Sequence, residues 1–321
     1  MNLKDNVLAE LIHNGNSYIS GSQLAKKFNV SRTAIWKCIE QLKDEGCQIG
    51  AVTKRGYILL SIPDLFNLNY METLLANCKT KWQVQFFDEI DSTNNYAKKL
   101  AYQGAPAGTV IVANKQTAGK GRLGKSFHSP SGGLYFSIIL RPDLPLKDMM
   151  SVTACTAAAI HEALLQNGIS TKIKWVNDLF LNEKKVCGIL SEGSFNAELL
   201  SMDYLVIGIG INIHPDPNLP DELKNIVTDI QTATGKVIRR CDLVAQILAQ
   251  LEELLAGLAQ HTYLPIYTEN SCTLGHRVHV KASQGECDAL AIGFTEDAGL
   301  IVRLSDGTQE IIRTGTAQII D

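Results

Sequence analysis

The sequence predicts a multidomain α+β protein: an N-terminal winged helix-turn-helix, a central mixed β-sheet with helices, and a small C-terminal β-barrel. Three observations predict this architecture. The first part holds two helical patterns joined by a short turn, the middle mixes apolar strands with long helices, and short alternating segments separated by turn residues follow Gly275. At 321 residues the chain exceeds the usual size of one domain. We expect domains at 1–62, 82–269 and 270–321, with a linker and short helix at 63–81.

Composition indicates a globular protein of the cytoplasm. Charged residues interrupt the first apolar run, which argues against a signal peptide, and no apolar run approaches the roughly 20 residues of a membrane helix. The eight cysteines are scattered without a C-x-x-C pair, which favours reduced thiols and argues against a metal site. Net charge is -3, yet residues 1–60 carry eight basic and five acidic residues. A basic N-terminal module is therefore joined to an acidic body.

The basic module is predicted to bind DNA. After a first helix over 3–13, Ser22 is expected to cap a short helix that ends at Phe28, and Ser31 a longer helix that ends at Gly46. Two helices joined by so short a turn form a helix-turn-helix, whose second helix reaches DNA. Two short strands then enclose a basic turn. The residues expected at DNA are Ser31, Arg32, Thr33, Lys37, Lys54 and Arg55. A module used only for packing or protein contact is the alternative.

The body is expected to begin near Trp82 with a strand, followed by a helix that Asp91, Ser92 or Thr93 caps. Glycines in the strand at 204–213 remove side chains where a ligand or another backbone comes close, although a bulge explains them equally well. The other predicted strands are 108–113, 134–140, 171–175, 179–181 and 185–192, and the other helices are 147–167 and 242–260.

The loop at 114–128 reads N-K-Q-T-A-G-K-G-R-L-G-K-S-F-H and is the most informative stretch. Its glycines and cations allow the backbone to wrap around an anion. The same letters contain G-x-G-x-x-G and G-x-x-x-x-G-K-[ST], motifs that both need a helix directly after the last glycine. Pro130 and Gly132-Gly133 forbid such a helix. Asp143 follows the last glycine at the distance where a dinucleotide fold has its ribose ligand, but without the helix this spacing carries no weight. We predict instead a strand-to-strand loop that folds over a phosphorylated ligand.

No arrangement of a nucleophile with a base and an orienting acid is recognisable, and the G-x-S-x-G and HExxH motifs are absent. The cations suit a reaction that depends on positioning and charge stabilisation, such as attack of a carboxylate on the α-phosphate of ATP. Lys174 lies on a predicted strand ahead of Asn177 and Asp178, where a solvated surface residue is an equally good explanation.

Together these motifs resemble the biotin protein ligases. Q-T-A-G-K-G-R-L-G (116–124) resembles their ligand loop and K-W-V-N-D (174–178) their lysine signature. S-T-N (92–94), K-V-C-G-I-L-S-E and G-I-G-I-N-I occur in the family's order. The resemblance covers essentially the whole chain. It implies the class II synthetase-like fold of biotin and lipoate ligases, an SH3-like C-terminal barrel, and the domain plan of bifunctional bacterial members that also repress biotin operons.

The activity implied by the resemblance has two half-reactions. Biotin and MgATP give biotinyl-5'-AMP and pyrophosphate, and the biotinyl group then passes to a lysine of a biotin carboxyl carrier protein. The resemblance also implies a homodimer that represses biotin biosynthesis genes at operator DNA, with biotinyl-5'-AMP as corepressor. The loop would be poorly ordered until both ligands arrive, so that its ordering links catalysis to dimerisation.

Site residues follow from the resemblance by position. Lys174 and Arg122 would be catalytic, Lys174 as an electrostatic stabiliser and not as a nucleophile. Trp175 and Leu190 would provide apolar walls. Biotin would contact Ser92, Thr93, Asn94, Gln116, Gly119, Lys120, Arg122 and Lys174. The nucleotide would contact Lys120, Arg122, Phe127, Asn177 and Asn212.

Three positions depart from the family's pattern. Lys120 stands where arginine is usual, Val176 where proline is usual, and Phe127 where tryptophan often covers the adenine. Lys120 loses bidentate phosphate contact, and Val176 is expected to loosen a turn. These departures leave open a ligand-sensing repressor that has lost catalysis. Lipoate ligation on the related fold is a further alternative, although such ligases usually lack a winged helix.

Overall fold

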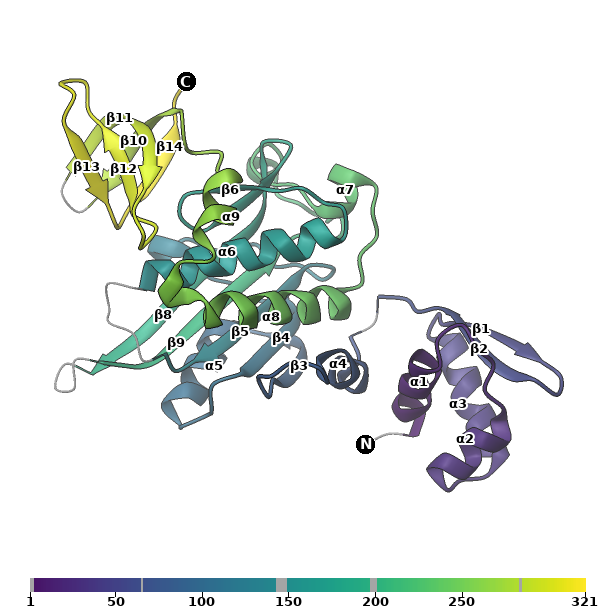
Figure 1. Ribbon diagram of the computed structural model, residues 1–321. Coiled ribbons are helices and arrows are strands. Elements are labelled where there is room, and N and C mark those ends of the chain that lie inside the picture. Colours follow the sequence, from purple (N-terminus) through teal and green to yellow (C-terminus); the bar gives the residue numbers. More distant parts are fainter. Residues whose placement is uncertain (1–2, 65, 143–148, 197–200, 283–284) are drawn as a thin grey trace. The chain divides into compact units, whose positions relative to one another are not determined.

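A computed structural model describes residues 3–64, 66–142, 149–196, 201–282 and 285–321 (Figure 1). The chain divides into two compact units. The first comprises residues 1–77 and 238–245, and the second residues 78–237 and 246–321. The finer boundaries expected from the sequence remain predictions. Among the described helices, none is long and apolar enough to cross a membrane.

The first unit is a winged helix-turn-helix extended by one helix. It contains α1 (Leu3–His13), α2 (Gly21–Phe28), α3 (Arg32–Asp44), β1 (Gln48–Val52), β2 (Gly56–Ser61) and α4 (Leu68–Leu75). The antiparallel pair β1–β2 forms the wing. Apolar residues one helical turn apart, such as Ile35, Ile39 and Leu42 of α3, are buried in the core of this unit. Helix amphipathicity therefore holds the three-helix core together.

Helix capping follows the prediction at one position and departs from it at another. Ser31 caps α3, where its Oγ accepts a hydrogen bond from the Ala34 N–H at 3.1 Å. Ser22, however, lies inside α2, and the cap is Ser20. Ser20 and Gln23 form a reciprocal capping box, which satisfies two backbone N–H groups at once and so starts the helix earlier.

The first turns of α8 (Arg240–Ala256) belong to the first unit. Arg240 Nε donates to Asp64 Oδ2 at 2.7 Å, with both side chains mostly buried. Tyr70 donates its phenolic hydrogen to Asp242. These polar contacts join the segment after the wing to the beginning of a helix that continues into the second unit.

The second unit is built on a seven-stranded sheet with the order β3-β4-β5-β9-β8-β7-β6. Only β3–β4 is a parallel pair, and the other pairs are antiparallel. The strands are β3 (Gln83–Ile90), β4 (Thr109–Gln116), β5 (Leu134–Leu140), β6 (Lys172–Lys174), β7 (Asp178–Leu181), β8 (Lys184–Asn196) and β9 (Ser201–Ile211). A mixed sheet with helices is therefore confirmed.

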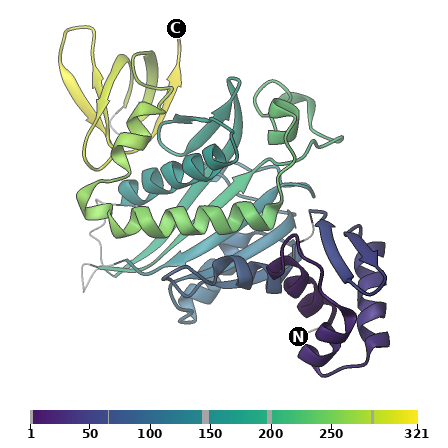
Figure 2. The same cartoon turned by 45° about the vertical axis from the view of Figure 1, so that its right-hand side comes forward.

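Helices cover this sheet. α5 (Thr93–Tyr102) packs through Ala97 and Ala101 against Ile111, Ile139 and Val206. α6 (Met149–Gln166) and α8 lie side by side over the sheet in Figure 2. The predicted small residues of α6 are fully buried, which permits close packing; they are Ala154, Ala157, Ala158 and Ala159. The predicted beginning of α6 at 147 and the position of Asp143 lie outside the described residues.

The C-terminal part is a five-stranded antiparallel sheet with the order β13-β12-β11-β10-β14. Its strands are β10 (Arg277–Ala282), β11 (Gly285–Phe294), β12 (Leu300–Arg303), β13 (Gln309–Ile312) and β14 (Thr316–Ile319). The predicted antiparallel sheet is confirmed. In the part of the chain that the structure describes, β13 and β14 are the edges and do not pair with each other, so a closed barrel is not confirmed.

Short elements complete the second unit, and the last two of them lie between α8 and the C-terminal sheet. They are η1 (Arg122–Gly124), η3 (Asp221–Leu223), α7 (Ile230–Thr234), η4 (Leu258–Gln260) and α9 (Leu264–Glu269). Trp175 Nε1 donates to Ala298 O at 3.0 Å, and the Tyr267 hydroxyl of α9 donates to Val176 O at 3.1 Å. The Trp175–Val176 peptide bond is cis. Trp175 thus anchors the C-terminal sheet, and the predicted role as a ligand wall is not what the structure shows.

A candidate active site under the glycine-rich loop

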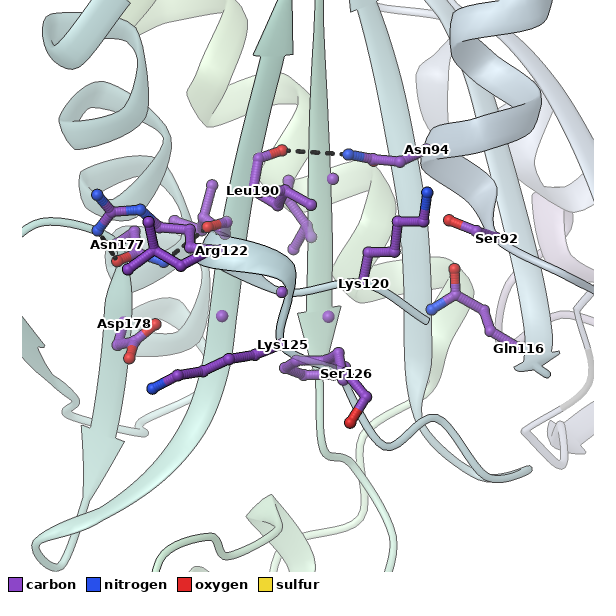
Figure 3. Close-up of a pocket in the computed structure, with 18 of the residues that line it drawn as sticks. Ser92, Asn94, Gln116, Lys120, Arg122, Lys125, Ser126, Asn177, Asp178 and Leu190 are labelled. Carbon is purple, nitrogen blue, oxygen red and sulfur yellow. Dashed lines mark hydrogen bonds between the residues drawn. The ribbon is translucent and has the colours of Figure 1, made fainter. Parts of the chain in front are cut away.

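A pocket lies between the glycine-rich loop and the sheet (Figure 3). Five regions line it: the N-terminus of α5, the end of β4, the loop from Lys120 to Phe127, the strands β7, β8 and β9, and Thr316 of the C-terminal sheet. All of these belong to the second unit. The predicted residues that line the pocket are Ser92, Thr93, Asn94, Gln116, Lys120, Arg122, Phe127, Asn177 and Leu190.

One end of the pocket is lined by uncharged polar residues of α5 and β4. Ser92 caps α5, as one of the predicted alternatives, because its Oγ accepts from the Asn95 N–H at 3.4 Å. Gln116, at the end of β4, turns toward this helix, and its Oε1 accepts from the Thr93 N–H at 2.9 Å. Only 1%, 3% and 4% of Ser92, Thr93 and Asn94 are exposed. These residues are thus almost wholly covered by protein, and they border the pocket with only a small part of their surface.

The loop forms a hairpin without an α-helix. The Gly121 N–H donates to Lys125 O at 2.7 Å, and the Phe127 N–H donates to Gly119 O at 2.9 Å. A single 3-10 turn, Arg122–Gly124, is followed by extended backbone leading to β5. The exclusion of the two phosphate-binding motifs is thus confirmed. A Cβ on Gly119 would lie 2.4 Å from Phe127 O, so this glycine serves the hairpin, and it does not line the pocket where contact with biotin was predicted.

The other end of the pocket gathers positive charge. Arg122 Nη1 donates to Asn177 Oδ1 at 3.1 Å, and Nη2 donates to Gly315 O at 3.1 Å. Burial lowers the pKa of Arg122, while the nearby Asp178 and Tyr267 oppose that shift. An arginine stays protonated even so. A guanidinium fixed at two points in a partly dehydrated pocket is well suited to stabilise negative charge.

Two lysines leave the loop in different directions. Figure 3 shows Lys120 directed toward Ser92 and Asn94, and Lys125 directed toward the side where Asp178 lies. Both line the pocket. Lys125 was not predicted as a site residue. It belongs to the glycine-rich loop, but no feature of the sequence distinguishes it from the other cations of that loop.

The predicted catalytic lysine does not line the pocket. Lys174 stands on β6, where its Nζ lies 5.5 Å from the centre of the Phe180 ring. Lys185 of β8 lines the pocket instead, 5.9 Å from the centre of the Phe127 ring. The strand order explains this placement, because β7 separates β6 from β8 and keeps Lys174 at the sheet edge. Lys185 is the first residue of K-V-C-G-I-L-S-E, so the signal was present in a motif already recognised.

Lys185 is paired with the carboxylate of the lysine signature. Its Nζ lies 2.7 Å from Asp178 Oδ1, and both side chains are about one-quarter exposed. The contact is an ion pair without a well-aligned hydrogen bond, because the buried Oδ1 of Asp178 has no hydrogen-bond partner of acceptable geometry. Asp178 was also missed, although it closes K-W-V-N-D. Within the described residues, no group of three or more potential metal ligands occurs, and the carboxylate among the pocket residues is Asp178.

The strand glycines admit side chains of the protein itself. A Cβ on Gly210 would lie 2.5 Å from the Phe127 ring, and a Cβ on Gly208 would lie 2.1 Å from Asn94 Oδ1. The groups that come close to these glycines are therefore side chains, and not the ligand or backbone that was predicted. Asn212, predicted to contact nucleotide, does not line the pocket. Its Nδ2 donates to Thr228 O at 3.0 Å, because the residue joins β9 to the segment that follows.

A second hollow lies in the first unit, between α3 and the wing. Arg32, Thr33 and Lys54 line it, as expected for a surface that contacts DNA. Ser31, Lys37 and Arg55 are exposed but lie outside it, and Ser31 is occupied in capping α3. Trp36, one helical turn after Arg32, also lines this groove and is 52% exposed. Sequence reasoning missed it because a tryptophan at helical spacing is normally expected in the core.

Comparison with known proteins supports both units. The profile of the Biotin/lipoate A/B protein ligase family matches residues 86–212, and that of an HTH domain matches residues 4–58. The chain is similar to "Bifunctional ligase/repressor BirA" of Bacillus subtilis (strain 168), with 35% identity over 92% of this chain and 93% of that protein. It is also similar to the Escherichia coli (strain K12) protein of that name, with 32% identity over 66% of this chain and 65% of that one.

A solved structure has the same fold as the second unit's ligase region. The biotin protein ligase from Aquifex aeolicus in complex with biotin and ATP aligns with a TM-score of 0.63 and 29% identity. The alignment covers 75% of this chain and 99% of that one.

Proposed function

The chain belongs to the biotin/lipoate A/B protein ligase family, as a bifunctional ligase and repressor, and we propose on this premise that the pocket joins biotin to ATP. One observation carries the proposal: a single pocket is lined by uncharged polar side chains at the head of α5 and by the cations Lys120, Arg122 and Lys185. Biotin has the matching form, with a neutral ureido ring and a carboxylate. ATP supplies the additional negative charge that the cations would hold.

Biotin would lie with its ureido group against Ser92, Thr93 and Gln116, whose polar atoms converge at the closed end. Its aliphatic chain would run along Leu190 toward the loop. Asn94 also lines the pocket, but its carboxamide is already engaged by neighbouring side chains. Apolar contacts would then provide affinity, and the few polar groups would set the orientation.

Adenylation requires a carboxylate oxygen of biotin to attack the α-phosphorus of ATP. The new O–P bond forms as the bond to pyrophosphate breaks, and negative charge grows on the phosphate oxygens. Arg122 and Lys185, each held by a neighbouring group, would neutralise this charge together with Lys120. Lys185 takes the role of electrostatic stabiliser that the resemblance had suggested for Lys174. Phe127 and Asn177 would border the nucleotide.

In the second half-reaction, the amine of a carrier lysine attacks the biotinyl carbonyl carbon, and AMP leaves. The carrier is a biotin carboxyl carrier protein. Mg²⁺ would accompany ATP. Because the carboxylate among the described pocket residues is Asp178, the ion would be held mainly by phosphate oxygens and water, with Asp178 as the protein's contribution.

The first unit is the repressor part. Arg32, Thr33, Lys37, Lys54 and Arg55 would contact operator DNA, and Ser31 would support them by capping α3. Biotinyl-5'-AMP would act as corepressor, with the loop ordering around it and favouring a homodimer. A cytoplasmic location is part of this proposal and agrees with eight free cysteines.

Exchange of labelled pyrophosphate into ATP tests the ligase reaction directly. Exchange should depend on biotin and Mg²⁺, and lipoate should neither replace biotin nor compete with it. Exchange with lipoate would favour lipoate ligation. Absence of exchange at saturating biotin and Mg²⁺, combined with retained operator binding, would favour a repressor that only senses its ligand.

A further inference from the structure

Ser137 is a buried polar residue beneath the polar end of the pocket. It lies on β5, is 0% exposed, and does not line the pocket itself. Its Oγ lies 2.6 Å from Asn94 Oδ1 and 2.8 Å from Thr93 Oγ1. A buried hydroxyl that contacts two residues at the head of α5 can control how those residues present their hydrogen-bonding groups.

The orientation of the Asn94 carboxamide is determined by its partners. Its Nδ2 donates to Glu192 Oε2 at 2.8 Å and to Leu190 O at 3.4 Å, and both of these are acceptors. Lys98 holds the other oxygen of Glu192 at 2.6 Å. Burial raises the pKa of Glu192, but its hydrogen bonds to Lys98 and Asn94 outweigh burial and lower it, so the carboxylate remains an acceptor. Asn94 Oδ1 therefore faces Ser137.

Counting protons assigns the direction of the remaining bonds. A hydroxyl has one hydrogen, and an amide oxygen has none to donate. The Ser137 hydrogen must therefore go to Asn94 Oδ1, and the hydrogen between Ser137 Oγ and Thr93 Oγ1 must come from Thr93. Thr93 then has no hydrogen for Gln116 Oε1, which is 3.1 Å away, or for a ligand.

This arrangement leaves acceptors at the pocket surface. Thr93 lines the pocket, and a hydroxyl oxygen that donates its hydrogen to Ser137 can still accept one from a ligand. Gln116 Oε1 accepts the Thr93 N–H at 2.9 Å and keeps room for one more donor. Gly208 makes the arrangement possible, because a Cβ there would overlap Asn94 Oδ1 at 2.1 Å.

We propose that Ser137 is a positioning residue that fixes Thr93 and Gln116 as hydrogen-bond acceptors, so that the closed end of the pocket selects ligands with N–H donors, such as a cyclic urea. The inference rests on the proposed function, because it assigns the ureido group of biotin to this end. It adds a residue that neither the sequence motifs nor the pocket lining includes.

Steady-state kinetics of Ser137→Ala, with Ser191→Ala as a matched control, test the inference. Ser191 lies on β8 of the same sheet, its hydroxyl pairs with Thr153 Oγ1 at 2.8 Å, and it does not line the pocket. Loss of one hydrogen bond corresponds to a change of about tenfold. We expect Ser137→Ala to raise the KM for biotin about tenfold and to change the KM for ATP less than about twofold. Ser191→Ala should leave both unchanged.

Ser137→Cys provides a second variant that fills nearly the same volume with a weaker donor. Its KM for biotin should lie between those of the wild type and Ser137→Ala. Equal rises in both KM values, or a biotin KM that matches the Ser191→Ala control, would overturn the positioning role. Wild-type enzyme without biotin-dependent exchange would instead overturn the proposed function, so the two failures are distinguishable.

Discussion

At the scale of single residues, Lys174 and Lys185 show how position on a sheet decides a role. Lys174 stands on the edge strand β6 against Phe180, whereas Lys185 projects from β8 into the pocket beside Asp178 and Phe127. Both are lysines within recognised motifs. Only the second lines the cavity that Arg122 also lines.

We predict that Lys185→Ala lowers the rate of biotin-dependent pyrophosphate exchange by about 10²- to 10³-fold, the usual effect of removing one group that stabilises transition-state charge. Lys174→Ala, the matched control, should stay within about threefold of wild type. Measuring exchange at saturating substrates checks both. A large loss in Lys174→Ala with an active Lys185→Ala would restore the original assignment.

At the scale of elements, α3 and the wing form one groove with a basic and aromatic lining. Arg32 and Thr33 come from the first turn of α3, and Lys54 comes from the turn between β1 and β2. Lys54 adopts a left-handed backbone with φ of 69°, which belongs to the tight turn of the wing. Helix and wing together can follow a phosphate backbone.

Arg32→Ala is expected to weaken operator binding and to reduce the slope of log K against log salt by about 1. The reason is that a protein with one phosphate contact fewer releases fewer counterions when it binds DNA. Lys81→Ala, an exposed lysine of the second unit, is the control and should keep the wild-type slope. Titrations at several salt concentrations measure both. An unchanged slope for Arg32→Ala would place Arg32 away from phosphate.

At the scale of the whole molecule, folding of the second unit is linked to pH through a buried histidine. His161 of α6 is 1% exposed, and its Nδ1 lies 2.9 Å from Thr171 Oγ1. Burial lowers its pKa, with smaller opposing effects from Glu162 and Thr171. The unfolded chain therefore binds this proton at a higher pH than the native protein does.

The stability contributed by neutral His161 is complete above the unfolded pKa of about 6.5 and is lost as pH falls toward the lowered native value. We predict that the free energy of unfolding of wild type falls below pH 6.5, by at most about 1.4 kcal/mol per pH unit from this group. His161→Gln should remove that component, whereas Thr171→Ser should keep it. Denaturant unfolding between pH 5 and 8 measures the difference, and parallel curves for wild type and His161→Gln would contradict the prediction.

Features that depend only on neighbouring residues could be predicted from the sequence. Ser31 caps α3, the alanines of α6 allow close packing, and Pro130 with the following glycines excludes a helix after the loop. Each is a matter of backbone geometry or spacing over a few residues. The ordered motifs likewise sufficed for the resemblance, which the comparisons support.

The tertiary structure decided everything that depends on residues far apart in the chain. It brings Gly315 and Thr316 of the C-terminal sheet to Arg122, and it places Lys185 rather than Lys174 at the pocket. It also fills the space at Gly208 and Gly210 with Asn94 and Phe127. No local pattern encodes these contacts, because strand order and helix packing arise only when the whole sheet has formed and the apolar surfaces are buried together.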